Sequence, residues 1–88
     1  MRIKEGFVMR EMAGGFVAVP VEGESREFQG MVQLNETGAF LWKELEQECR
    51  METLVDALMN TYEVSRKQAE MDARKTVEML KKAGILRE

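Results

Sequence analysis

The sequence contains no histidine and only one cysteine, Cys49. Without histidine the chain cannot assemble a Ser-His or Cys-His nucleophile pair from its own residues. A single thiol cannot form an internal disulfide, which is compatible with a reducing compartment. With no partner thiol and no histidine, Cys49 is also a poor basis for a zinc or iron–sulfur site. We therefore expect no catalytic residue, no metal and no cofactor, and we interpret the chain as a cytoplasmic binding protein rather than an enzyme.

Long apolar runs and phosphate-binding glycine patterns are also missing. The longest uninterrupted apolar stretch falls far short of the roughly 20 residues that a membrane-spanning helix needs. The N-terminus has no apolar segment behind its basic residues, which argues against a signal peptide. The glycines form neither a dinucleotide-binding fingerprint nor a P-loop. These absences exclude a membrane partner and a nucleotide cofactor from our expectations.

Charge is divided unevenly along the 88 residues, which are enough for one domain, 1–88, with a single modest core. The whole chain has a formal net charge of -3. Residues 1–64 hold 6 Lys/Arg against 12 Asp/Glu, whereas residues 65–88 hold 7 against 4. Because duplex nucleic acid attracts positive surfaces, an acidic body with one basic segment argues against general nucleic-acid binding. The asymmetry leaves room for an acidic partner.

The first third of the chain has the pattern of a β-sheet. Residues 7–12 and 15–21 are rich in β-branched and aromatic side chains and flank a glycine-containing turn, which predicts an antiparallel hairpin. Pro20 cannot donate to a strand ladder, so the second strand should lie on an edge or leave the sheet there. Residues 22–27 are polar and predict a loop. Residues 30–34 then predict a short third strand.

A helical pattern begins where the third strand ends. Asn35 is placed as the N-cap of a helix over residues 36–46, because its side-chain oxygen can accept a hydrogen bond from a first-turn amide. The buried face of that helix carries Trp42, the only tryptophan. Phe40 points away from this face, so we expect that the sheet covers it or that it is exposed. A second helix begins at Met51, with apolar residues at helical spacing.

A third helix is predicted from residue 66 to about Lys82. Ser65 and Gln68 match a capping box, in which Ser reaches forward and Gln reaches back. Gly84 is placed as the left-handed residue that ends the helix, and residues 85–86 should fold back on the core. Three strands followed by three helices make an α+β fold with a winged-helix-like architecture.

Four short blocks carry a family resemblance: LNETGA at 34–39, LW at 41–42, YEV at 62–64 and GIL at 84–86. With these blocks, at this spacing, the sequence resembles the PqqD family over residues 7–87. Those proteins are small peptide-binding chaperones of pyrroloquinoline quinone biosynthesis, also called precursor-peptide recognition elements. The resemblance implies a fold of three strands and three helices, in agreement with the pattern above.

The resemblance also implies a function, which is binding of the leader segment of a ribosomally made precursor peptide. In the family the leader adds as an antiparallel strand to strand three, lies against helix three and is presented to a modifying enzyme, often a radical SAM protein. Strand addition draws affinity from main-chain hydrogen bonds and selectivity from side-chain pockets. The edge over residues 30–34 carries no charge and no proline that would block pairing.

The expected peptide-binding residues lie on this edge and on one flank of the third helix. Met71 and Met79 lie beside a core stripe that is already complete, and methionine is adaptable on peptide-binding surfaces. Lys75 lies between them. The opposite flank, with Lys67 and Arg74, stays open as an alternative groove wall. The candidate contacts are Met31, Val32, Gln33, Leu34, Gln68, Met71, Lys75 and Met79.

The strand-to-helix block itself is interpreted as scaffold rather than contact. Capping by Asn35, close packing at Gly38 and core burial of Trp42 explain these residues without a ligand. Phe40 is a candidate contact with a partner enzyme.

Two other functions remain as alternatives. A winged-helix protein can bind nucleic acid with its third helix as the recognition helix, and the basic segment 65–88 allows this although the net charge opposes it. An open strand edge can also pair with a second copy and give a homodimer. Salt-dependent binding to duplex DNA would favour the first alternative. A concentration-dependent dimer in sedimentation would favour the second.

Overall fold

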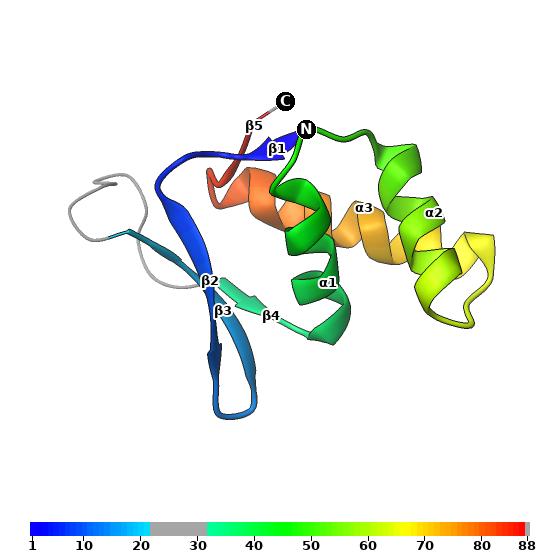
Figure 1. Cartoon of the computed structure of the whole chain (residues 1–88), viewed down its shortest axis with the longest axis horizontal. Coiled ribbons are helices and arrows are strands. Elements are labelled where there is room, and N and C mark those ends of the chain that lie inside the picture. Colours follow the sequence, from blue (N-terminus) through cyan, green and yellow to red (C-terminus); the bar gives the residue numbers. More distant parts are fainter. Residues whose placement is uncertain (22–31, 88) are drawn as a thin grey trace.

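A three-stranded sheet followed by three helices accounts for most of the computed structural model, which describes residues 1–21 and 32–87 (Figure 1). The sheet contains β2 (Phe7–Met12), β3 (Gly15–Pro20) and β4 (Val32–Leu34). The helices are α1 (Glu36–Leu45), α2 (Met51–Thr61) and α3 (Arg66–Lys82). This arrangement confirms the predicted α+β class and order of elements. The predictions for the loop over 22–27 and for residues 30–31, Met31 included, lie outside the described residues.

The sheet is antiparallel, with β3 between β2 and β4. Met12 pairs with Gly15 across a two-residue turn, and Gly14 adopts a φ of 87°, which favours glycine. Pro20 is the last residue of β3 and pairs with Phe7 of β2, and among the described residues the pairing of β3 with β4 covers Phe16 to Ala18.

Local side-chain hydrogen bonds define two helix starts. The Asn35 Oδ1 atom accepts from the Gly38 amide at 2.7 Å, and the Ser65 Oγ atom accepts from the Gln68 amide at 3.1 Å. Both predicted caps are confirmed. The other half of the predicted capping box, in which the Gln68 side chain reaches back to Ser65, was wrong. The Gln68 Nε2 atom instead donates to the Asp72 Oδ1 atom at 2.9 Å. That bond joins two residues four apart on the exposed face of α3.

The core lies between the sheet and the helices. Trp42 is 1% exposed and belongs to one cluster with buried residues of α2, α3 and the sheet, which confirms it as a core residue. Phe40 is half-buried and packs against the core, which lies between the two predicted alternatives. Its ring packs edge-to-face on Tyr62, with ring centroids 5.4 Å apart. Tyr62 lies just beyond α2, so this pair joins α1 to the end of α2.

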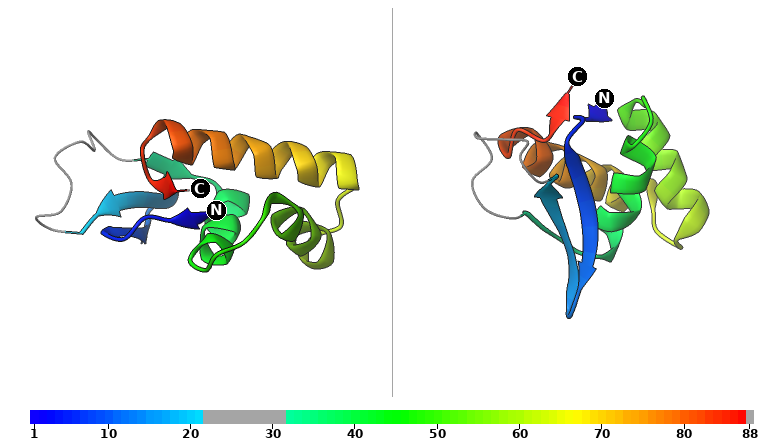
Figure 2. Two further views of the ribbon diagram at one scale, coloured as in Figure 1. Left: turned by 90° about the horizontal axis from the view of Figure 1, so that it is seen from above. Right: turned by 60° about the vertical axis from the view of Figure 1, so that its left-hand side comes forward.

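A second, two-stranded sheet holds the two chain ends side by side (Figures 1 and 2). β1 (Arg2–Ile3) pairs antiparallel with β5 (Leu86–Arg87). Gly84 ends α3 with a φ of 75°, which turns the chain back so that Ile85 is fully buried. The predicted return of residues 85–86 to the core is confirmed. Their pairing with the N-terminal segment was not predicted.

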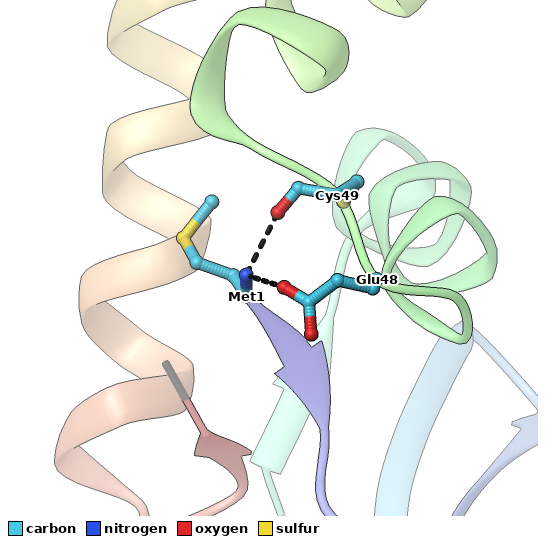
Figure 3. Close-up of polar contacts among 3 residues, drawn as sticks. All are labelled: Met1, Glu48 and Cys49. Atoms are coloured by element: carbon cyan, nitrogen blue, oxygen red, sulfur yellow. Dashed lines mark hydrogen bonds and ion pairs between the residues drawn. The ribbon is translucent and has the colours of Figure 1, made fainter.

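The first residue is tied to the connection between α1 and α2 (Figure 3). The Met1 ammonium group donates to a carboxylate oxygen of Glu48 and, at 2.8 Å, to the carbonyl oxygen of Cys49. The Cys49 amide in turn donates to the Met1 carbonyl at 3.0 Å. The hydrogen bond from the ammonium group lowers the pKa of Glu48, whereas burial raises the pKa of the Cys49 thiol. These contacts fix β1 against the helices.

Among the residues that the structure describes, none of the helices has the length and apolar content to cross a membrane.

Candidate functional site

β4 is an edge strand of the sheet. Within the described part of the chain, β3 pairs with one side of β4 and no strand pairs with the other. Leu34 is buried and Val32 packs against the same core, whereas Gln33 points to the opposite face and is exposed. In an antiparallel ladder, alternate residues direct their amide and carbonyl groups to each side. The free side of β4 can therefore pair with one more strand.

A cleft opens where β4 ends, between the hairpin turn and α3. We call it the hairpin cleft. It has a volume of about 550 Å³ and is lined by residues 12–17, 33–35, 75, 76 and 79. The register places the hairpin turn here, because Phe16 pairs with Leu34. Figure 2 shows β4 beside the C-terminal half of α3. Sheet edge and helix thus form two walls, and the hairpin turn forms a third.

A second hollow lies on the outer face of α3. We call it the helix hollow. Its volume is about 800 Å³, and it is lined by residues 68, 71, 72, 74, 75, 78, 79 and 82. Lys75 and Met79 line both the hairpin cleft and the helix hollow. The two hollows therefore meet along one flank of the helix.

The buried stripe of α3 determines which side chains face these hollows. Ala69, Ala73, Val77 and Leu80 are buried against α1 and α2, which fixes the rotation of the helix about its axis. Positions four apart along the neighbouring flank then turn outward, and Met71 is 58% exposed as a result. The flank is set by core packing rather than by contacts of its own.

Lys75 is the only ionisable residue among the described residues that line the hairpin cleft. It is exposed, and no ion pair within the described ranges includes it. Arg66, near the start of α3, is different, since it lies 3.8 Å from Asp56 and 3.6 Å from Glu70. The cation that lines the cleft beside the open strand edge is thus not engaged in an ion pair within the described residues.

The structure brings together most of the residues predicted to bind peptide. Gln33 and Leu34 line the hairpin cleft with Lys75 and Met79, while Gln68 and Met71 line the helix hollow. Val32 lies on β4 but lines neither hollow, and Met31 is outside the described residues. On the flank that was predicted as the alternative groove wall, Arg74 lines the helix hollow, whereas Lys67 lines neither the helix hollow nor the hairpin cleft.

Sequence reasoning missed the hairpin turn as a wall of the cleft. Residues 12–16 were predicted as strand and turn, and Met12 is 52% exposed beside the cleft. The Gly14-Gly15 pair indicated the turn, but its position beside Leu34 depends on pairing between β3 and β4. Thr76 is buried in the core and also lines the cleft.

Asn35 both caps α1 and lines the hairpin cleft. We expect Asn35→Ala to lower the free energy of unfolding by about 1 kcal/mol, because the Gly38 amide loses its acceptor. Asn35→Asp keeps an acceptor at the same place and should be nearly neutral. Urea denaturation of the three proteins measures the difference. Equal losses in both variants would show that the cap bond is not the cause.

The described residues offer no group of three or more His, Cys, Asp or Glu side chains that could hold a metal ion. The residues that line the hairpin cleft offer hydrogen-bonding groups, apolar contacts and one cation, Lys75. Such a set of groups can bind a peptide segment.

Comparison with known proteins identifies a family and two similar structures. The family model of coenzyme PQQ synthesis protein D (PqqD) matches residues 15–86. TbiB1, solved in complex with the TbiA(beta) leader peptide, is 25% identical, with a TM-score of 0.74 over 99% of this chain and 95% of that one. A lasso peptide synthetase B1, complexed with the leader peptide, is 24% identical, with a TM-score of 0.72 over 99% of this chain and 96% of that one. A comparison with curated proteins gives no match.

Proposed function

This chain belongs to the PqqD family, and from that membership we propose that residues 1–88 form a recognition domain for the leader segment of a ribosomally made precursor peptide. The observation that carries the proposal is the open edge of β4 beside the hairpin cleft. TbiB1, which shares the fold, has been solved with a leader peptide bound. The role is recognition rather than catalysis.

The physical basis of binding is addition of a strand to β4. An extended peptide can exchange main-chain hydrogen bonds with the unpaired side of Val32–Leu34, while its alternate side chains reach toward α3. The edge is short and carries no charge within Val32–Leu34, so nothing there repels an incoming strand. Because three residues supply few hydrogen bonds, the side chains of α3 and the hairpin turn must contribute much of the affinity.

Presentation of the bound peptide to a modifying enzyme completes the proposal. By the family pattern this enzyme is of the radical SAM type, and both proteins act in the cytoplasm. Phe40 is half-buried against Tyr62, so its aromatic edge-to-face contact favours a packing role over a contact with the enzyme.

NMR titration tests strand addition directly. The probe is a synthetic peptide that corresponds to the leader segment of the cognate precursor peptide. We expect the amide signals of Val32–Leu34 and the methyl signals of Met71 and Met79 to shift on addition of this peptide. The amide signals of α2 (Met51–Thr61) should stay in place, because that helix lines neither hollow.

Shifts confined to α2 would contradict the proposal. A concentration-dependent dimer that the leader fails to dissociate would instead assign the edge of β4 to self-association. Strong, salt-dependent binding to arbitrary duplex DNA would favour a nucleic-acid binder. The helix hollow argues against that function, because Asp72 and Glu78 lie among its cations.

A further inference from the structure

The charge on α3 is concentrated where the peptide would lie. Three cations line the helix hollow, namely Arg74, Lys75 and Lys82, and Lys75 also faces the hairpin cleft. The rest of the chain is acidic, with 12 Asp/Glu against 6 Lys/Arg over residues 1–64. An acidic peptide is therefore repelled by most of the surface and attracted to this flank.

The two anions near these cations do not neutralise Lys75. Asp72 accepts a hydrogen bond from Gln68, one turn closer to the start of the helix. Glu78 lines only the helix hollow and does not reach the hairpin cleft. On the cleft side Lys75 is surrounded by apolar or uncharged groups, among them Phe16, Thr76 and Met79. A carboxylate placed there would meet one cation and, among the residues that the structure describes, no competing anion.

The neighbours of Lys75 along the flank are both methionines. Met71 and Met79 lie four residues before and after it, about 6 Å away along the helix axis on each side. Side chains on one face of a β-strand are two residues apart, a separation of about 7 Å. Since β4 lies beside the C-terminal half of α3 in Figure 2, a strand that pairs with β4 and continues along the helix can match the spacing of the three helix residues.

We propose that Lys75 selects for an acidic residue in the peptide, flanked two positions away on each side by large apolar residues. The pattern is apolar-x-acidic-x-apolar, with Met71 and Met79 contacting the apolar side chains and Lys75 pairing with the carboxylate. This inference rests on the proposed function, because it requires the peptide to bind as a strand along β4. It adds the class of peptide that the site accepts.

Selection from a random peptide library tests the pattern and requires no natural leader sequence. A library of random 12-residue peptides, displayed on mRNA, is selected on the wild-type protein and on Lys75→Glu. We expect the pattern apolar-x-acidic-x-apolar with the wild type. With Lys75→Glu the central acid should be replaced by Lys or Arg, while the apolar positions persist.

A matched control and a charge swap make the test specific. Lys67→Glu changes the net charge equally on the same helix but lies outside both hollows, so its selected peptides should keep the acidic residue. A synthetic peptide with a sequence selected on the wild-type protein should bind Lys75→Glu about tenfold more weakly than it binds the wild type. The reason is that the attraction between residue 75 and the peptide's carboxylate becomes repulsion. Replacing its acidic residue by lysine should restore binding to Lys75→Glu.

The outcomes separate this inference from the function on which it rests. Selected peptides that shift the amide signals of β4 but show no acidic preference would overturn the inference and leave strand addition standing. If the peptides selected on Lys67→Glu also lack the acidic residue, the inference is overturned too, because the net charge of the protein would then explain the change in both variants. Failure to select any peptide that shifts β4 would overturn both.

Discussion

Replacing Trp42 by alanine will lower the free energy of unfolding by about 3 to 5 kcal/mol. The indole is 1% exposed at the centre of the cluster that joins α1, α2, α3 and the sheet, so its removal leaves a large cavity. A domain of this length has a total stability of roughly 4 to 13 kcal/mol. The substitution therefore removes a large share of the total.

Denaturant unfolding of the two proteins measures this loss. Trp42→Phe provides the matched control, because it keeps an aromatic ring in the same cavity and should cost less than half as much. A substitution on the surface, by comparison, should change the free energy of unfolding by no more than about 0.5 kcal/mol. A loss below about 1 kcal/mol for Trp42→Ala would contradict the central position of this residue in the core.

Methylation of the peptide backbone will weaken binding at every second residue of the segment that pairs with β4. An N-methyl group removes the amide donor and adds bulk at the strand edge. Where that amide points at Val32–Leu34, we expect a loss of about 1 to 3 kcal/mol, which is roughly 5- to 150-fold in affinity. At the intervening residues the amides point away from β4, so methylation there should have little effect.

A set of synthetic leader peptides, each methylated at one residue, measures this alternation by calorimetry. The unmethylated leader and a peptide methylated outside the paired segment serve as controls. A uniform loss across the segment, or none at all, would show that the peptide does not bind as an added strand. The test leaves the protein unchanged, so it separates binding from folding.

The features that could be predicted from the sequence depend on neighbouring residues. The N-cap at Asn35 joins residues three positions apart, the hairpin turn lies between two adjacent strands, and the turn at Gly84 requires only that one residue adopt a positive φ. The family resemblance added the position of the edge strand. These parts of the fold could be predicted because each interaction lies within one element or one turn.

The features that were missed depend on residues far apart in the chain. β1 and β5 are two residues each, too short for a periodic pattern, and their pairing joins Arg2 to Arg87. The hairpin wall of the cleft depends on the register between Phe16 and Leu34, which no local signal fixes. The packing of Phe40 on Tyr62 likewise depends on how α1 lies relative to the end of α2, which the sequence leaves undefined.

The pairing of the chain ends has a consequence for how the molecule opens. Closing a loop from Arg2 to Arg87 carries the largest entropic cost of any contact in the described sheets, and the β1–β5 ladder itself contains two residue pairs. This small sheet should therefore form late in folding and open first in local fluctuations. Its amides should exchange with solvent deuterium well before those of the α3 core, while the peptide-binding flank stays assembled.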